Sequence, residues 1–349
     1  PPKFFCNFFV SAMDLDISII FFLCIIFRSD ACWFLGGNLL CNLTVHIFKN
    51  KCVDFAIEAK KNPKKINFYN AGPSINTADN EYFPTITADE NYFVYTRKIS
   101  CQNCLSKSQE DLFISKKDAA STWAESRQIN ELSSDGNEGA PSISADGNYM
   151  FMTISQEMDG KYMGGQSDGL GSCDIFYTQK INGRWMKPIN LGTKINSSMW
   201  ESQPSFSSDG KTLYFNSNMP GGLGGNDIWK VDVAEGDVYG TPVNMGSKIN
   251  TEGNEQFPSI TDDNVLYFSS DSRQGLGGLD VYVINLNKSE DAQNLGKPVN
   301  SEKDDFSFSF NTKRNLGFFS SNREESDDLY IAKPLCSVES TILVTNAVS

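Results

Sequence analysis

The stretch Pro204-Ser-Phe-Ser-Ser-Asp-Gly-Lys-Thr-Leu-Tyr-Phe-Asn-Ser-Asn218 decides the fold, because it describes two short strands joined by a tight turn. Asp209-Gly210 in its middle is a strong hairpin signal, and the same signal stands at Asp146-Gly147. A type I′ turn needs positive φ at both central residues, and Asp-Gly pairs favour it. We therefore expect a type I′ hairpin at both places.

The same unit recurs five times from residue 66 onward, and such a period has priority over every other inference from sequence. Each copy has an acid at one place in its first strand: Glu81, Glu138, Glu201, Glu255 and Asp305. A third strand begins in each copy at a second recurrent acid: Asp111, Asp174, Asp227, Asp280 and Asp328. A fourth strand is expected at the Pro-x-Asn-x-Gly stretch, as in Asn190-Leu-Gly192.

Four antiparallel strands that repeat at intervals of roughly fifty to sixty residues are typical of a propeller blade. One such unit has too few apolar positions to bury a core alone, so neighbouring units must stack. The repeat region starts with a fourth strand, Ile66–Gly72, and ends with a third strand, Asp328–Ala332. Pairing these ends would complete one blade and remove the exposed edges. We predict an all-β, five-bladed β-propeller of four-stranded antiparallel blades, closed by pairing of its N- and C-terminal strands.

Three segments carry a resemblance to a known family: Trp185-Met-Lys-Pro-Ile-Asn-Leu-Gly192, Glu201-Ser-Gln-Pro-Ser-Phe-Ser-Ser-Asp-Gly210 and Pro220-Gly-Gly-Leu-Gly-Gly-Asn-Asp-Ile-Trp229. They resemble the WD-like repeat of TolB-type propellers and, more closely, the propeller of OmpA-family envelope proteins of Bacteroidetes. In that family the usual order is a tetratricopeptide-like helical region, the propeller, a small carboxypeptidase-regulatory-like sandwich and a peptidoglycan-binding OmpA-type domain. The resemblance implies a periplasmic, outer-membrane-associated protein with a scaffold role of the type IX secretion and gliding kind.

The same resemblance suggests how the chain is divided into domains. Residues 51–65 are expected to form a short helix left from an upstream helical-repeat region, 66–334 the propeller, and 335–349 a linker and the start of a following domain. Residues 1–50 are an uncertain segment, either signal-like or non-native. Their apolar run Ile17–Phe27 is about half as long as a membrane span, so no direct span is expected. Peptidoglycan would be reached only through a domain absent from this chain.

The net charge of the chain indicates which classes of partner it does not bind. Lys and Arg number 30 against 43 Asp and Glu, a net charge of −13, which repels phosphate backbones and argues against nucleic acid. The single histidine, His46, precedes the predicted propeller. No Ser-His-Asp or Cys-His arrangement can therefore be assembled within the propeller from this sequence.

The recurrent acids repeat once per blade, whereas a catalytic pair should break the symmetry. Their expected role is structural, capping turns and fixing strand entry, so we predict no catalytic, cofactor-binding or metal-binding residues. The glycine-rich runs Gly221–Gly225 and Gly275–Gly278 precede strands, not helices, and are interpreted as flexible connections, not as phosphate loops.

Two further features of the sequence are candidate sites. Cys101 and Cys104 stand close together on a loop and could form a local disulfide in an oxidising periplasm. The stretches Asp168–Asp174, Asp159-Gly160 and Asn226-Asp227 offer oxygen ligands but match no defined calcium loop. We expect no cofactor and keep calcium as the lesser alternative.

The resulting hypothesis is a non-enzymatic binding scaffold of the bacterial envelope that contacts proteins or the cell wall through its propeller loops. The connections near Lys98–Glu110 and Gln156–Ser172 are longer than their counterparts and are the expected contact segments for envelope proteins. The alternative is a propeller hydrolase or lyase that acts on carbohydrate or peptide in the periplasm. It would require an asymmetric cluster of acids with perturbed pKa values in the channel.

Overall fold

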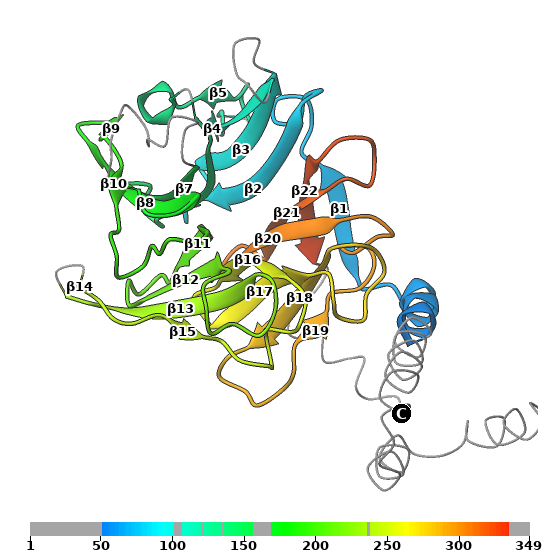
Figure 1. Cartoon of the computed structure of the whole chain (residues 1–349). Helices are drawn as coiled ribbons and strands as arrows, with labels where there is room; N and C mark the ends of the chain where they lie inside the picture. Colours follow the sequence, from blue (N-terminus) through cyan, green and yellow to red (C-terminus); the bar gives the residue numbers. More distant parts are fainter. Residues whose placement is uncertain are drawn as a thin grey trace, which may run out of the picture. The chain divides into compact units, whose positions relative to one another are not determined.

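The computed structural model describes residues 51–100, 107–119, 122–134, 136–155, 169–235 and 238–334 (Figure 1). The uncertain segment 1–50 and the segment 335–349 lie outside the described residues. Residues 51–61 are helical, and the helix ends before Asn62-Pro63. All strands belong to the second of two compact units, Phe55–Ser349. Within the described part of the chain, no helix is long and apolar enough to cross a membrane.

The strands form five antiparallel sheets, the blades, in sequence order (Figure 1). Blade 1 contains β2 (Asn80–Ile86), β3 (Tyr92–Ser100), β4 (Ser108–Lys116) and β5 (Arg127–Gln128), and the 3-10 helix η2 (Asn130–Leu132) follows it. Blade 2 contains β6 (Glu138–Ile143), β7 (Tyr149–Ser155), β8 (Cys173–Ile181), β9 (Arg184–Trp185) and β10 (Ile189–Asn190). Blade 3 contains β11 (Glu201–Phe206), β12 (Thr212–Ser217), β13 (Asp227–Ala234), β14 (Val238–Tyr239) and β15 (Val243–Asn244). Blade 4 contains β16 (Glu255–Ile260), β17 (Val265–Ser270), β18 (Asp280–Asn285) and β19 (Gln293–Asn294).

Blade 5 joins the two ends of the repeat region. It contains β20 (Asp305–Asn311), β21 (Leu316–Ser321), β22 (Asp328–Pro334) and, as its outer strand, β1 (Ile66–Asn70). In the antiparallel pairing of β1 with β22, Ile66 lies opposite Pro334 and Asn70 lies opposite Tyr330. The first strands contact one another around a ring in the order β2, β6, β11, β16, β20 and back to β2. The predicted closed five-bladed propeller is therefore confirmed.

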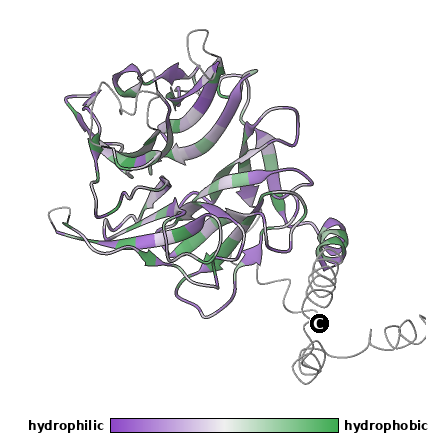
Figure 2. Ribbon diagram, in the orientation of Figure 1, coloured by the Kyte–Doolittle hydropathy of each residue, from purple (hydrophilic) through white to green (hydrophobic). Residues whose placement is uncertain are grey.

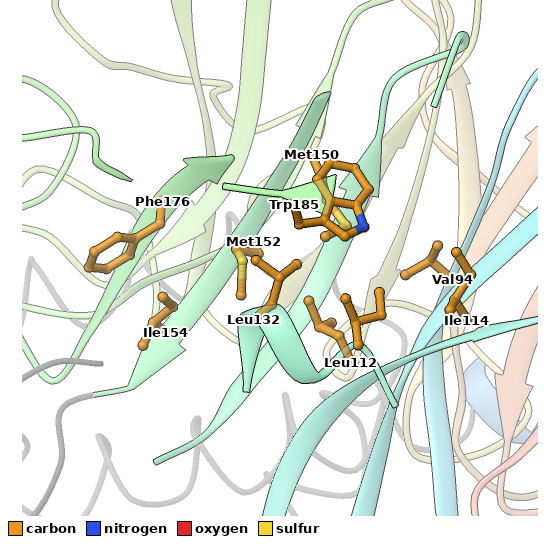
Figure 3. Packing of buried hydrophobic residues seen from close by; sticks show 10 residues of the cluster. Val94, Leu112, Ile114, Leu132, Met150, Met152, Ile154, Phe176 and Trp185 are labelled. Atoms are coloured by element: carbon orange, nitrogen blue, oxygen red, sulfur yellow. The ribbon is translucent and has the colours of Figure 1, made fainter. Parts of the chain in front are cut away.

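Each interface between neighbouring blades has its own hydrophobic core. Between blades 1 and 2, Val94 and Leu112 face Met150 and Met152, with Trp185 beside them (Figure 3). Burying one such side chain contributes about 1.5–3 kcal/mol to the stability of the fold. In an isolated blade the same side chain would be exposed to water. Figure 2 shows the same distribution, with apolar residues gathered on the strands. Stacking is thus what stabilises the blades.

The hairpin between the first and second strands differs from the predicted type I′ turn. Gly147 and Gly210 have φ values of 73° and 71°, but Asp146 and Asp209 are not among the residues with positive φ. In blade 3 the Ser207 hydroxyl and the Lys211 N–H both donate to Oδ1 of Asp209. An aspartate that bonds its own turn in this way stabilises a negative φ at the aspartate itself. Only the glycine that follows it adopts the left-handed backbone conformation.

A bulge interrupts the first strand of every blade. The bulge residue has a positive φ in each: Phe83, Ala140, Gln203, Phe257 and Ser307. The register of each first strand against its second strand shifts at this residue. Since bulges redirect side chains, the same residue of each blade can be turned toward a shared central channel.

Candidate functional site

The acids predicted to recur in the first strands are all fully buried and accept hydrogen bonds in the same way. In blade 3, the backbone N–H and the hydroxyl of Ser197 both donate to Glu201, over 2.7 Å each. The corresponding donors in the other blades are Thr77, Ser134, Thr251 and Ser301. Because a buried carboxylate is tolerated only when it is hydrogen-bonded, these acids are structural parts of each blade.

The acids at the start of the third strands hold a second polar cluster. Asp174 accepts hydrogen bonds from the N–H groups of Leu170 and Gly171 and from Nδ2 of Asn190. Asn190 in turn accepts from Asn196, which bonds both backbone groups of Ile175. Blades 3 and 5 repeat this arrangement around Asp227 and Asp328. The Asn-x-Gly repeat of the sequence is thus explained by this cluster, which we call the polar clasp.

Blade 1 has a variation of the clasp, whereas blade 4 repeats it, with the N–H groups of Leu276 and Gly277 donating to Asp280 and Asn300 donating to Asn294. Asp111 accepts from Nε2 of Gln109 at 2.7 Å. In blade 4, Asn300 bonds the backbone of Val281, while burial, and more weakly the charge of Asp305, raise the pKa of Asp280 to about 7. The recurrent acids therefore lie one set per blade around the ring, and the structure does not bring them together in one site.

The glycine-rich connections are packed tightly, in contrast to the flexible loops expected from the sequence. A Cβ atom on Gly224 would lie 2.4 Å from the carbonyl oxygens of Gly253 and Thr251 in the connection to the next blade. Glycine is needed there for close approach of two backbones. The expectation of a flexible loop is therefore wrong here, because the loop packs against the connection between blades 3 and 4.

Two sequence predictions fall on residues that the structure does not describe. Cys101 and Cys104 lie outside the described residues, and so do Asp159 and Asp168 of the calcium alternative. Among the residues that are described, no group of three or more His, Cys, Asp or Glu side chains is placed to hold a metal ion.

Three cavities follow one another along the central channel. The bulge residues Phe83, Ala140, Gln203 and Phe257 line both the first and the second cavity, so these two adjoin. The first, of about 430 Å³, opens where the second strands pass into the third strands. We call it the loop-face mouth; Lys98 and Glu110, from one of the segments predicted for partner contact, line it. Residues 101–106 and 156–168 of these segments lie outside the described residues.

The loop-face mouth is asymmetric. Blades 1, 4 and 5 fill their side of the channel with aromatic rings: Phe83 and Phe257 have centroids 5.1 Å apart, and Phe257 and Phe306 5.0 Å apart. Blades 2 and 3 place Gly139, Ala140, Ser202 and Gln203 at the corresponding positions. These smaller side chains leave the space open, so the cavity has an aromatic wall and a polar wall.

Polar groups of blades 1 and 5 meet at the aromatic wall. The phenol of Tyr82 donates to Oε1 of Glu110 over 2.8 Å. Burial, and then the charges of Glu110 and Asp327, raise the pKa of Tyr82. Burial and the charge of Asp304 raise the pKa of Asp327, and the charge of Lys98 opposes them. The mouth therefore combines hydrogen-bonding groups with negative charge beside flat apolar surface.

Blade 3 breaks the symmetry of the ring around this mouth. Asn80, Asn137 and Asn254 each accept the N–H of a residue of the preceding blade: Asp327, Glu110 and Asn226. Blade 3 has Trp200 at the same position, and it forms a parallel bridge to Cys173. Burial raises the pKa of the Cys173 thiol, although hydrogen bonds with Ser155 and Trp200 oppose this. Sequence reasoning missed Trp200, although its replacement of the usual asparagine before the recurrent acid was a visible signal.

Comparison with known proteins extends to the fold alone. No family model matches the sequence, and no curated protein matches it. Solved structures of similar fold include TolB from Acinetobacter baumannii, with a TM-score of 0.45 and 15% identity over 74% of this chain and 53% of that chain. A putative TolB from Agrobacterium tumefaciens has a TM-score of 0.43 and 14% identity over 74% and 78%. An α-L-arabinofuranosidase from Lactobacillus brevis has a TM-score of 0.49 and 12% identity over 75% and 92%. The chain spans about half the length of the first of these.

Proposed function

We propose that this chain is a non-catalytic binding scaffold and that it holds a protein partner at the loop-face mouth. The observation that carries the proposal is that the polar residues that recur in every blade and those that do not recur have different roles. The acids that recur in every blade are committed to hydrogen bonds within the fold. The side chains that do not recur, above all Trp200, Gln203 and the Tyr82–Glu110 pair, converge on one open cavity.

The composition of this cavity suits a polypeptide. Aromatic surface beside amide and carboxylate groups is typical of sites that bind protein side chains, where a few aromatic anchors supply most of the affinity. The described residues that flank the two predicted contact segments, Lys98 and Glu110 for the first and Ser155 and Cys173 for the second, all line this cavity. A partner that enters the cavity with one side chain can therefore also contact these segments.

The test is capture of the partner from envelope extracts by the immobilised full chain, compared across matched variants. We expect Trp200→Ala and Glu110→Gln to lose the captured protein. Val238→Ala, a change at a 61% exposed residue of β14 away from the cavity, should retain it. Melting curves should be the same for all four proteins. Retention of the partner by both mouth variants would contradict the proposal.

The alternative, a hydrolase or lyase acting on carbohydrate or peptide, has one observation in its favour. Asp327, Glu110 and Tyr82 form an asymmetric group at the channel mouth, and the pKa of Asp327 is raised. Against it, the neighbouring carboxylates raise the pKa of Tyr82 further, so its phenol keeps its proton and is a poor nucleophile. Hydrolysis of glycoside or peptide substrates that disappears in Glu110→Gln would favour the enzyme.

We further infer a periplasmic location, in association with the outer membrane and with a machine of the type IX secretion kind. The support is the WD-like repeat in the segments 185–192, 201–210 and 220–229. Fractionation of cells that express the parent protein tests the location. The chain alone should not sediment with purified peptidoglycan, since we assign that binding to a domain outside this sequence.

A further inference from the structure

The end of the channel opposite to the loop-face mouth opens into a larger cavity, of about 720 Å³. Its volume lies within the range of ligand pockets. One large apolar side chain from each blade surrounds it: Ile86, Ile143, Phe206, Ile260 and Phe310. We call this cavity the apolar cup.

The ring of the apolar cup is built into the fold. Each of its five side chains is half-buried and packs against the core of a different blade interface. Three of them are also fixed through their backbone, because the N–H groups of Ile143, Phe206 and Ile260 donate to hydroxyls of the preceding blade. The cup is therefore a preformed apolar surface, which loses little entropy when a ligand enters.

One wall of the cup is more exposed than the rest. Tyr149 of blade 2 is 50% exposed, and Tyr177 and Tyr239 line the same side. Below the ring, the channel narrows to a cavity of about 60 Å³ between the prolines of the first strands. The cup can thus accept a short apolar insertion but gives no passage for a long chain.

Acidic side chains lie in the hairpin loops at the rim of the cup. Asp146 and Asp209 are exposed residues of the hairpin loops of blades 2 and 3, and their sequence neighbours Ala145, Ser208 and Gly210 line the cup. Hydrogen bonds from the Ser144 and Ser207 hydroxyls and from backbone N–H groups lower the pKa of both aspartates, so they stay ionised.

The basic side chains of the blade 5 hairpin loop are offset by their neighbours. Lys313 pairs with Asp262 at 3.6 Å, and Arg314 approaches Glu90 at 4.0 Å. The negative charge of the rim comes from all five hairpin loops between the first and second strands. These loops contain six acids against three basic residues: Asp89, Glu90, Asp146, Asp209, Asp262 and Asp263 against Lys211, Lys313 and Arg314.

We propose that the apolar cup is a second binding site, which takes a short apolar segment of a partner polypeptide flanked by lysine or arginine. Charge complementarity selects this occupant. An anionic lipid headgroup would be repelled by the rim, and the narrow channel floor leaves no room for an acyl chain. The site is independent of the loop-face mouth and lies at the other end of the channel.

The probe is the fluorescein-labelled peptide Lys-Lys-Leu-Phe-Leu-Lys-Lys, titrated with the full chain and followed by fluorescence anisotropy. Two matched peptides separate the contributions: one has glutamate in place of lysine, and the other has Ser-Gly-Ser in place of Leu-Phe-Leu. We expect binding of the first peptide that weakens with salt, and at least about tenfold weaker binding of both others.

Variants locate the site. Tyr149→Ser removes the exposed wall, and Asp146→Asn combined with Asp209→Asn removes charge while keeping an oxygen that caps each turn. Each should weaken the lysine peptide about tenfold. Val243→Ser, at a 55% exposed apolar residue of β15, and Trp200→Ala at the loop-face mouth should bind it as the unaltered chain does.

Several results would overturn the proposal. These are equal binding of all three peptides, unchanged affinity in Tyr149→Ser, and binding of the chain to phosphatidylglycerol vesicles that Tyr149→Ser abolishes. Self-association in sedimentation experiments that is lost in Tyr149→Ser would instead assign the cup to a second copy of the chain. A loss of affinity in Trp200→Ala alone would place the peptide at the loop-face mouth.

Discussion

Asn70 and Asp328 join the two ends of the propeller: Nδ2 of Asn70 donates to Oδ2 of Asp328 over 2.9 Å, across 258 residues of sequence. Asn76 adds two bonds of 2.9 Å to the backbone of Leu329. In blades 2 and 3 the same polar clasp forms within a single repeat. In blade 5 it forms only when the first strand returns to the last, so closure of the ring and completion of this blade are one event.

The first prediction concerns this closure. Deleting residues 66–72 removes β1, Asn70 and the strand pairing with β22, and leaves an open edge. We expect the cooperative melting temperature to fall by about 10 °C or more, measured by circular dichroism. The matched control is a chain that lacks only residues 1–63 and so keeps β1. It should melt close to the full chain. An unchanged melt after deletion of 66–72 would refute closure by this strand.

The second prediction concerns Asp280, whose pKa burial raises from 3.8 to about 7 in the folded chain. Below about pH 4 both states hold the proton, so Asp280 makes no difference to stability. Between about pH 4 and pH 7 the unfolded chain releases the proton and the folded chain keeps it, so the folded chain loses stability until both are ionised. The difference between the pKa values of Asp280 in the unfolded and folded chains corresponds to a loss of up to about 4 kcal/mol in the free energy of unfolding.

Asp280→Asn has no proton to release in this range. It should be more stable than the unaltered chain at pH 8 and similar to it at pH 4, as measured by urea unfolding at both values. Asp262→Asn, a change at an exposed residue of the same blade, serves as control for loss of one charge. A stability difference between Asp280→Asn and the unaltered chain that does not grow with pH would count against the assignment.

The third prediction concerns the packed glycine connections. Gly224→Ala places a Cβ atom 2.4 Å from two backbone oxygens, so the segment around Gly253 must move. We expect a loss of about 1–3 kcal/mol in the free energy of unfolding. Gly240→Ala, whose Cβ would have no neighbour closer than 3.4 Å, is the control and should change little. Equal stability of the two variants would show that the connection adapts freely.

The sequence predicted the fold well because its spacing repeats a physical unit. The recurrent asparagines and acids mark the polar clasp in almost every blade, and strand order at residues 66 and 328 predicted how the ring closes. The hairpin type was wrong because Asp209 bonds its own turn, a local contact that competes with the turn expected for Asp-Gly.

The candidate site was much harder to predict. The structural role of the recurrent acids followed from their regularity, but the loop-face mouth depends on side chains from several blades that meet only around the ring. The contact of Tyr82 with Glu110 and the position of Trp200 beside Cys173 have no signature in spacing. Departures from the repeat, such as Trp200 in place of asparagine, are the signal from which such a site can be found.

The central claim is that a protein partner binds at the loop-face mouth, and photo-crosslinking from within the cavity tests it most directly. Benzoylphenylalanine is placed at position 200, in place of Trp200, and in a parallel experiment at position 238, in place of the exposed Val238. After irradiation in envelope extracts, the account predicts a crosslinked protein from position 200 and none from position 238. Crosslinking from position 238 alone, or from neither position, would contradict it.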